Sequence, residues 1–178
     1  MVNVESRLFN HHCDLPLHVQ FHVSGNEILQ VDIVPDISCQ SKMTWEVIGE
    51  PDLDSMIDDW MCAYGEKKFC RMNLPLSLKH LHLPPYTSQV LLTLPTIQFG
   101  QTISYRELAS LTGRPKAARA AGSACGRNPF LLIVPCHRIL ASGGGLGGFS
   151  AGLAIKRHLL AFEGISVLAD APARSNRY

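Results

Sequence analysis

The chain has 178 residues, of which 46% are hydrophobic and 17% are charged, enough for one large or two small globular domains. It has no apolar run long enough to span a bilayer, and residues 1–9 contain Glu5 and Arg7 instead of a hydrophobic signal segment. We therefore expect a cytoplasmic protein without a membrane partner. Six cysteines without a framework spacing favour free thiols over disulfides: Cys13, Cys39, Cys62, Cys70, Cys125 and Cys136.

The net charge of +1 hides an asymmetry along the chain. Residues 1–80 hold 12 acidic residues and 6 Lys or Arg, whereas residues 81–178 hold 3 acidic residues and 10 Lys or Arg. No acidic residue lies between Glu107 and Glu163. Because a solvated surface normally mixes both signs, this basic stretch favours an anionic partner, and nucleic acid is the usual one.

The first 80 residues predict a small α/β domain. Apolar residues at 17, 19, 21 and 23 alternate with polar ones, which predicts a half-buried strand. Residues 24–27 predict a turn into a return strand over residues 28–34. Asp52 is a candidate N-cap for a helix with an apolar stripe over residues 53–64. The histidines fit the exposed face of the first strand better than a metal site, because the chain has no Cys-x-x-Cys pair.

The second part of the chain predicts a pair of short helices. After a linker around residues 75–85, a helix is expected over residues 87–94. Pro95, the next residue, ends or kinks this helix. Ser104 and Glu107 have the spacing of a capping box, which predicts a helix that runs through Leu111. Gly113 suits the end of that helix.

Pro115 suits the first position of a second helix, over residues 116–125. Two short helices joined by a glycine-containing turn form a helix-turn-helix pattern. The second helix is small and basic, with Arg119 set among alanines and a glycine. Small residues allow a backbone to approach another surface closely, so this helix is a candidate nucleic-acid contact.

A short apolar run over residues 131–134 leads into Pro135, Cys136, His137 and Arg138. The run predicts a buried strand that ends at Pro135, since proline has no N–H. Neighbouring cationic or imidazole groups lower the pKa of a thiol, so Cys136 is a candidate nucleophile. The alternative is an ordinary buried cysteine. Adjacent residues of an extended chain point to opposite faces, so His137 reaches the thiol through a backbone turn or through a water.

A catalytic base works best when a third group orients it. Residues 153–162 predict a helix that ends at Glu163 with Gly164 as its stop, and Glu163 is the candidate acid. The glycines of residues 142–148 match the spacing of a dinucleotide fingerprint, but too little chain follows to build a βαβ unit. This loop is interpreted as flexible backbone that covers a pocket.

From Phe99 to Gly164 the chain closely resembles the O6-alkylguanine-DNA alkyltransferases, also called methylated-DNA–protein-cysteine methyltransferases, while the first 80 residues match in outline only. The resemblance rests on several motifs in the same order: Ile103-Ser104-Tyr105, Pro115-Lys116-Ala117-Ala118-Arg119-Ala120, Asn128-Pro129, Pro135-Cys136-His137-Arg138, Ser150, and Leu159-Leu160-Ala161-Phe162-Glu163-Gly164.

The resemblance implies a two-domain α/β (α+β) protein, with a small sheet-and-helix domain over residues 1–80. The mainly helical domain over residues 81–178 would carry a helix-turn-helix of winged-helix type, bind DNA and transfer the alkyl group. The implied function is DNA repair in one irreversible turnover on O6-alkylguanine, with O4-alkylthymine as a further candidate substrate. The implied partner is double-stranded DNA, bound by a monomer without a cofactor. Asn26 stands where a cysteine would support an N-terminal zinc site, so no metal is expected.

The resemblance also implies a role for each site residue. Cys136 would accept the alkyl group, His137 would act as base through a water, and Glu163 would orient the imidazolium. Tyr105 would donate a proton toward N3 of the leaving guanine, and Asn128 would brace the turn before Cys136. The substrate- and DNA-binding residues would be Arg119, which enters the base stack, together with Tyr105, Lys116, Ala118, Arg127, Phe149, Ser150 and Ala151. A DNA-binding or signalling module without transfer activity is the alternative, and it would not need Cys136, His137 and Glu163 together.

Overall fold

The computed structural model describes residues 4–7, 17–35, 43–49, 53–68, 74–78 and 81–167. The predictions that Asp52 caps a helix and that Cys13, Cys39 and Cys70 are free thiols fall outside these residues. Within the described ranges, no helix combines the length and the apolar character that a membrane span requires.

A four-stranded sheet with the order β1-β4-β2-β3 forms the first part of the chain. The predicted hairpin is confirmed, since β2 and β3 pair antiparallel across a turn in which Gly25 has a φ of +54°. The apolar residues of β2 are buried and the residues between them are half-buried, as the alternation predicted. The strands are β1 (Val4–Arg7), β2 (Leu17–Ser24), β3 (Glu27–Pro35) and β4 (Thr44–Gly49).

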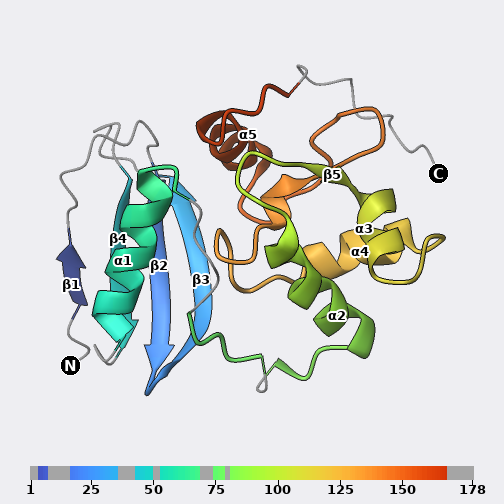
Figure 1. Cartoon of the computed structure of the whole chain (residues 1–178). Coiled ribbons are helices and arrows are strands. Elements are labelled where there is room, and N and C mark those ends of the chain that lie inside the picture. The colour runs from blue at the N-terminus through green and yellow to red at the C-terminus, as the bar shows by residue number, and fades with distance from the viewer. Residues whose placement is uncertain are drawn as a thin grey trace.

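Helix α1 (Asp54–Gly65) lies across one face of this sheet (Figure 1). It buries Ile57, Met61 and Tyr64, which are three residues of the predicted apolar stripe. Met56 belongs to the same predicted stripe but is 40% exposed, because it falls at the solvent edge of the buried face. The helix follows Leu53, which makes no side-chain capping bond.

The remaining helices gather beyond the β3 edge of the sheet (Figure 1). The predicted capping box is confirmed: the Glu107 N–H donates to Ser104 Oγ at 3.2 Å, and the Ser104 N–H donates to Glu107 Oε2 at 2.6 Å. The elements are α2 (Pro85–Thr93), η3 (Leu94–Thr96), β5 (Ile103–Ser104), α3 (Tyr105–Leu111), α4 (Ala118–Cys125), η4 (Cys136–Arg138), β6 (Ile139–Leu140) and α5 (Leu153–Phe162). Strands β5 and β6 pair parallel.

The start of α4 differs from the sequence prediction. The helix begins at Ala118, not at Lys116. Pro115 lies in a turn that the Ala117 N–H closes by donating to the Arg114 carbonyl at 2.8 Å. Proline favours the second position of such turns as well as the start of a helix, so the residue type alone did not distinguish the two.

The predicted strand over residues 131–134 was wrong. These residues are buried, but they form consecutive turns, in which Leu132 has a φ of +72° and the Val134 N–H donates to the Phe130 carbonyl at 2.9 Å. A short apolar run signals burial without fixing the backbone conformation. The strand of this region is β6, which begins only after Cys136.

The turn before Cys136 is hydrogen-bonded to the edge of the sheet. The Val31 N–H of β3 donates to the Pro129 carbonyl at 2.7 Å, and the Leu131 N–H donates to the Val31 carbonyl at 3.1 Å. Farther along β3, Ile28 exchanges hydrogen bonds with the backbone of Pro75 and Ser77, so the predicted linker starts as a segment paired with this strand. The two parts of the chain are therefore joined by backbone pairing.

Candidate functional site

Cys136 lies at the start of η4, with its side chain almost fully buried. Its thiol accepts a hydrogen bond from Asn128 Nδ2 at 3.1 Å. The same amide nitrogen donates to the Val134 carbonyl at 2.7 Å, and the Asn128 oxygen accepts from the Phe130 N–H at 3.0 Å. One amide side chain thus holds both ends of the turn and the sulfur atom, and these bonds supply the partners that a strand would have given the backbone.

The thiol faces a cavity of about 200 Å³ formed by α3, α4 and the glycine-rich loop. The loop covers the pocket as predicted. Gly147 has a φ of +69°, and a Cβ there would come within 2.9 Å of the Tyr105 ring, so the loop and the ring can pack this closely only with glycine. The lining residues are Tyr105, Gly122, Cys125, Gly126, Cys136, Gly148, Phe149 and Ser150.

Three of the predicted substrate residues, Tyr105, Phe149 and Ser150, therefore meet at the thiol. Ala151 lies instead in a more open groove, to which Ser150 and Asn128 also contribute. The Tyr105 hydroxyl donates to the Gly148 carbonyl at 3.4 Å. Burial raises the pKa of the Tyr105 phenol, so the phenol keeps its proton.

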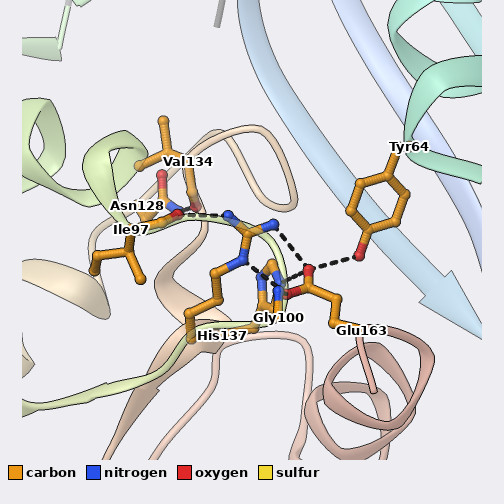
Figure 2. A network of polar contacts seen from close by, with 8 residues as sticks. Tyr64, Ile97, Gly100, Asn128, Val134, His137 and Glu163 are labelled. Atoms are coloured by element: carbon orange, nitrogen blue, oxygen red, sulfur yellow. Dashed lines mark hydrogen bonds and ion pairs between the residues drawn. The ribbon is translucent and has the colours of Figure 1, made fainter. Parts of the chain in front are cut away.

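The residue after Cys136, His137, forms a carboxylate–imidazole pair with Glu163, and both side chains are fully buried. His137 Nε2 lies 2.8 Å from Glu163 Oε1. Arg138 clamps the same carboxylate, with Nε 2.8 Å from Oε2 and one terminal nitrogen 2.9 Å from Oε1. Figure 2 shows Glu163 between His137 and the hydroxyl of Tyr64. Sequence reasoning brought His137 and Glu163 together but missed the clamp by Arg138.

The donors around Glu163 assign the protons of the pair. Burial raises its carboxyl pKa, but the hydrogen bonds and charges of His137 and Arg138 outweigh burial and hold the pKa at about 2. An ionised carboxylate can only accept, so His137 Nε2 carries the hydrogen and Nδ1 keeps its lone pair. Among the described residues, the buried Nδ1 atom has no hydrogen-bond partner. It is therefore the atom of this pair that can take up a proton.

The thiol is protonated at rest. Burial raises the pKa of Cys136, although the Asn128 hydrogen bond and the charge of Lys156 oppose this effect. Burial also lowers the pKa of His137. The expectation that its sequence neighbours His137 and Arg138 lower the pKa of the Cys136 thiol was wrong, because burial raises that pKa and the guanidinium of Arg138 points to Glu163 and not to the sulfur atom. A neutral thiol and a neutral imidazole are the stable forms.

Lys156 has an inward position that the sequence did not predict. It comes from α5, is fully buried, and donates to the carbonyls of Ile139 and Leu146, both at 2.5 Å, and of Gly148 at 3.3 Å. Burial lowers its pKa to about 8. This ammonium joins β6 to the glycine-rich loop. Lys156 lies in the stretch without acidic residues that predicted a basic surface, but its side chain is not part of that surface.

Replacing Lys156 with methionine should lower the free energy of unfolding by about 2 kcal/mol, because three carbonyls lose a donor and each buried orphan costs about 1–3 kcal/mol, partly offset by removal of a buried charge. Urea unfolding at neutral pH measures the effect. His158→Ala, on the exposed side of the same helix, should change the stability by less than about 0.5 kcal/mol. Equal stabilities for the two variants would show that the loop does not depend on the ammonium.

The predicted DNA-contacting residues of this region lie at or near the surface. Arg119, Lys116 and Arg127 are exposed and Ala118 is half-buried. Helix α4 buries Ala121, Ala124 and Cys125, while Gly122 of the same helix lines the cavity. The helix that carries Arg119 therefore also forms one wall of the thiol pocket.

Comparisons with known proteins identify relatives of this chain. A family model described as "6-O-methylguanine DNA methyltransferase, DNA binding domain" matches residues 85–165. The methylated-DNA–protein-cysteine methyltransferase of Mycobacterium tuberculosis is 37% identical over 121 residues, which cover 68% of this chain and 72% of that protein. The chain therefore belongs to the family of methylated-DNA–protein-cysteine methyltransferases.

The chain spans less than two thirds of the length of the mammalian relatives that it matches. The human methylated-DNA–protein-cysteine methyltransferase is 40% identical over 122 residues, covering 66% of this chain and 59% of the human protein. A crystal structure described as Mycobacterium tuberculosis OGT in complex with DNA superposes with a TM-score of 0.65 at 28% identity, covering 83% of this chain and 93% of that one. The mixed α/β fold is thus shared with a member of the family.

Proposed function

We propose that this protein repairs O6-alkylguanine in DNA by transferring the alkyl group to Cys136 in a single irreversible turnover. The observation that carries the proposal is the buried Cys136 thiol, which lines a cavity and is followed in sequence by His137 of the His137–Glu163 pair, in a chain of this family. In the proposed step the sulfur forms a bond to the alkyl carbon and the bond from that carbon to O6 breaks. The step also needs a base that accepts the thiol proton and an acid that protonates the leaving guanine.

The proton would leave Cys136 for His137 Nδ1 through a bridging water. The sulfur atom is hydrogen-bonded to Asn128, and within the described residues no hydrogen bond joins it to the imidazole. Glu163, held ionised, would stabilise the imidazolium. Tyr105 would donate toward N3 of the departing guanine, which needs a proton to leave as a neutral base.

The damaged nucleotide must leave the duplex to enter this cavity, because a stacked base cannot reach an enclosed thiol. We propose that α3 and α4 act as a helix-turn-helix of winged-helix type within a C-terminal domain over residues 81–178. The small residues of α4, including Ala118, would allow an approach along the minor groove. The exposed Arg119 would fill the gap left by the extruded nucleotide, and Ser150 and its neighbours would hold the base.

Mass spectrometry after incubation with an O6-methylguanine oligonucleotide tests the proposal. The expected result is an increase by the mass of one methylene group, in a ratio of one methyl per chain, together with an unmodified guanine in the DNA. An unchanged mass with intact binding to the damaged duplex would instead establish a recognition module without transfer activity.

Replacing Arg119 with alanine should slow the repair of duplex DNA by at least about tenfold, because extrusion of a stacked base costs a few kcal/mol. Free O6-benzylguanine needs no extrusion and should react at nearly the wild-type rate. Single-turnover rates on the two substrates measure the difference.

The matched controls are Lys116→Ala and Arg127→Ala, which remove exposed cations from the same surface. Each should weaken duplex binding and reduce its salt dependence by about one phosphate contact, with a much smaller effect on the rate at saturating DNA. If Arg119→Ala slowed both substrates equally, Arg119 would support the fold of the site and would not replace the flipped nucleotide.

A further inference from the structure

In the proposed reaction Cys136, His137 and Glu163 form a proton relay, and the first part of the chain contacts the carboxylate of this relay through the hydroxyl group of Tyr64. Tyr64, near the end of α1, donates to Glu163 Oε1 at 3.0 Å, and Figure 2 shows it approaching Glu163 from the helix that covers the sheet. The phenol lies 99 residues from Glu163 in sequence. The first 80 residues resemble the family in outline only, and the resemblance implied no role for Tyr64.

The ring of Tyr64 is held on several sides. It stacks on Trp60 with centroids 5.5 Å apart and an interplanar angle of 7°. It also contacts Phe99 at 5.6 Å and Phe162 at 5.5 Å, both from the second part of the chain. With 1% of its surface exposed, the ring has little freedom, so packing fixes the position of its hydroxyl oxygen beside Glu163.

Three donors converge on the one oxygen atom that faces the imidazole. Glu163 Oε1 accepts from His137 Nε2, from an Arg138 terminal nitrogen and from the Tyr64 hydroxyl. Glu163 Oε2 accepts from Arg138 Nε and, at 3.3 Å, from the Gly100 N–H. Tyr64 is the donor that fixes the carboxylate from the side of the sheet, and it is neutral, so it moderates the charge on Oε1 without adding a cation.

We propose that Tyr64 is a positioning residue for the His137–Glu163 relay, so that helix α1 takes part in alkyl transfer through its phenolic O–H. The inference rests on the proposed alkyl-transfer function and deepens it. The hydroxyl keeps the Glu163 oxygen aligned with His137 Nε2, and it draws electron density from that oxygen. The first part of the chain is then a component of the relay as well as a scaffold for it.

The sign of the expected pH effect follows from the charges around His137. Glu163 favours the imidazolium, whereas Arg138 and Lys156 disfavour it, and burial lowers the pKa of His137 further. Removing the Tyr64 hydroxyl leaves more charge on Glu163 Oε1, which raises the pKa of His137. The rate falls at low pH when His137 is protonated, so the acid limb of the rate profile should move to higher pH.

The test compares Tyr64→Phe with Tyr86→Phe. Both lose one phenolic hydroxyl, but the Tyr86 hydroxyl is hydrogen-bonded to Thr112 and not to the relay. Single-turnover rates on free O6-benzylguanine are measured across pH, and the His137 ring is titrated by NMR in each full-length variant. For Tyr64→Phe we expect a rate lower by roughly tenfold, as for loss of one hydrogen bond to a charged group. Its acid limb and the NMR pKa of His137 should both rise, whereas Tyr86→Phe should match wild type.

Two results would overturn the inference. One is a Tyr64→Phe profile equal to that of wild type. The other is a loss that is equal at every pH with an unchanged pKa for His137, which would reduce Tyr64 to a packing residue. If the wild-type chain did not accept an alkyl group at all, the proposed function would fail. In that case the NMR titration alone would decide whether the phenol acts on His137.

Discussion

Replacing Cys136 with alanine is expected to abolish alkyl transfer from an O6-methylguanine duplex while duplex binding stays close to wild type. The sulfur atom is the acceptor in the proposed reaction, and no phosphate contact involves it because the side chain is buried beside Asn128. Methyl incorporation by mass spectrometry and binding by fluorescence anisotropy measure the two properties on the same variant.

Peptide mapping of the methylated wild-type protein supplies the control for this result. Cys125 lines the same cavity, but it is not followed in the chain by a histidine that pairs with a carboxylate, as Cys136 is. The methyl group should therefore be found on Cys136 alone, and Cys62→Ala should react like wild type. A methyl group on Cys125 or Cys62 would remove Cys136 from its assigned role.

Replacing Glu163 with glutamine is expected to slow transfer by about 10²–10⁴-fold, the range typical for loss of general acid–base assistance. The amide carries no charge, so the imidazolium loses its counter-ion and Arg138 keeps an unpaired buried charge. Single-turnover rates with duplex DNA and with free O6-benzylguanine should fall alike, because the defect lies in the chemical step.

The same substitution should change how stability depends on pH. The Glu163 carboxyl has a pKa of about 2 in the folded protein and an ordinary, higher pKa when unfolded. It therefore stabilises the fold fully above about pH 5, and this contribution of roughly 3 kcal/mol is lost as pH falls toward 2. Denaturant unfolding between pH 7 and pH 3 should show a steeper loss for wild type than for Glu163→Gln.

Glu107→Gln is the matched control, because this exposed carboxylate caps α3 and does not contact the relay. It should keep the wild-type transfer rate and lose only a few tenths to about 1 kcal/mol of stability, as expected for a weakened cap. A Glu163→Gln protein that transfers as fast as Glu107→Gln would exclude Glu163 from the mechanism.

Elements with a local chemical signature could be predicted from the sequence. The β2–β3 hairpin followed from alternation and a glycine turn, α3 from the Ser104–Glu107 capping box, and the end of α5 from Gly164, which has a φ of +80°. Each of these depends on residues within a few positions of one another. The cysteine, histidine and acid of the candidate site were found because their residue types imply a chemistry.

Features that depend on distant partners could not be predicted in this way. The run over residues 131–134 has the composition of a strand, but the Asn128 side chain and the edge of β3 stabilise turns there. The sequence predicts Lys156 as a surface cation, and only its three carbonyl partners, which are distant in sequence, explain why it is buried. Tyr64 reads as one more apolar position of a helix, because nothing near it in sequence indicates that Glu163 lies against its hydroxyl.

The pairing of β3 with the segments around Pro75 and Pro129 also affects self-association of the chain. A sheet edge with free N–H and C=O groups can add a strand from another molecule. Here residues that follow the sheet in sequence occupy the edge of β3. A fragment truncated within the first part of the chain would expose that edge and invite strand addition between copies, so expression of the sheet alone should favour aggregates over a folded monomer.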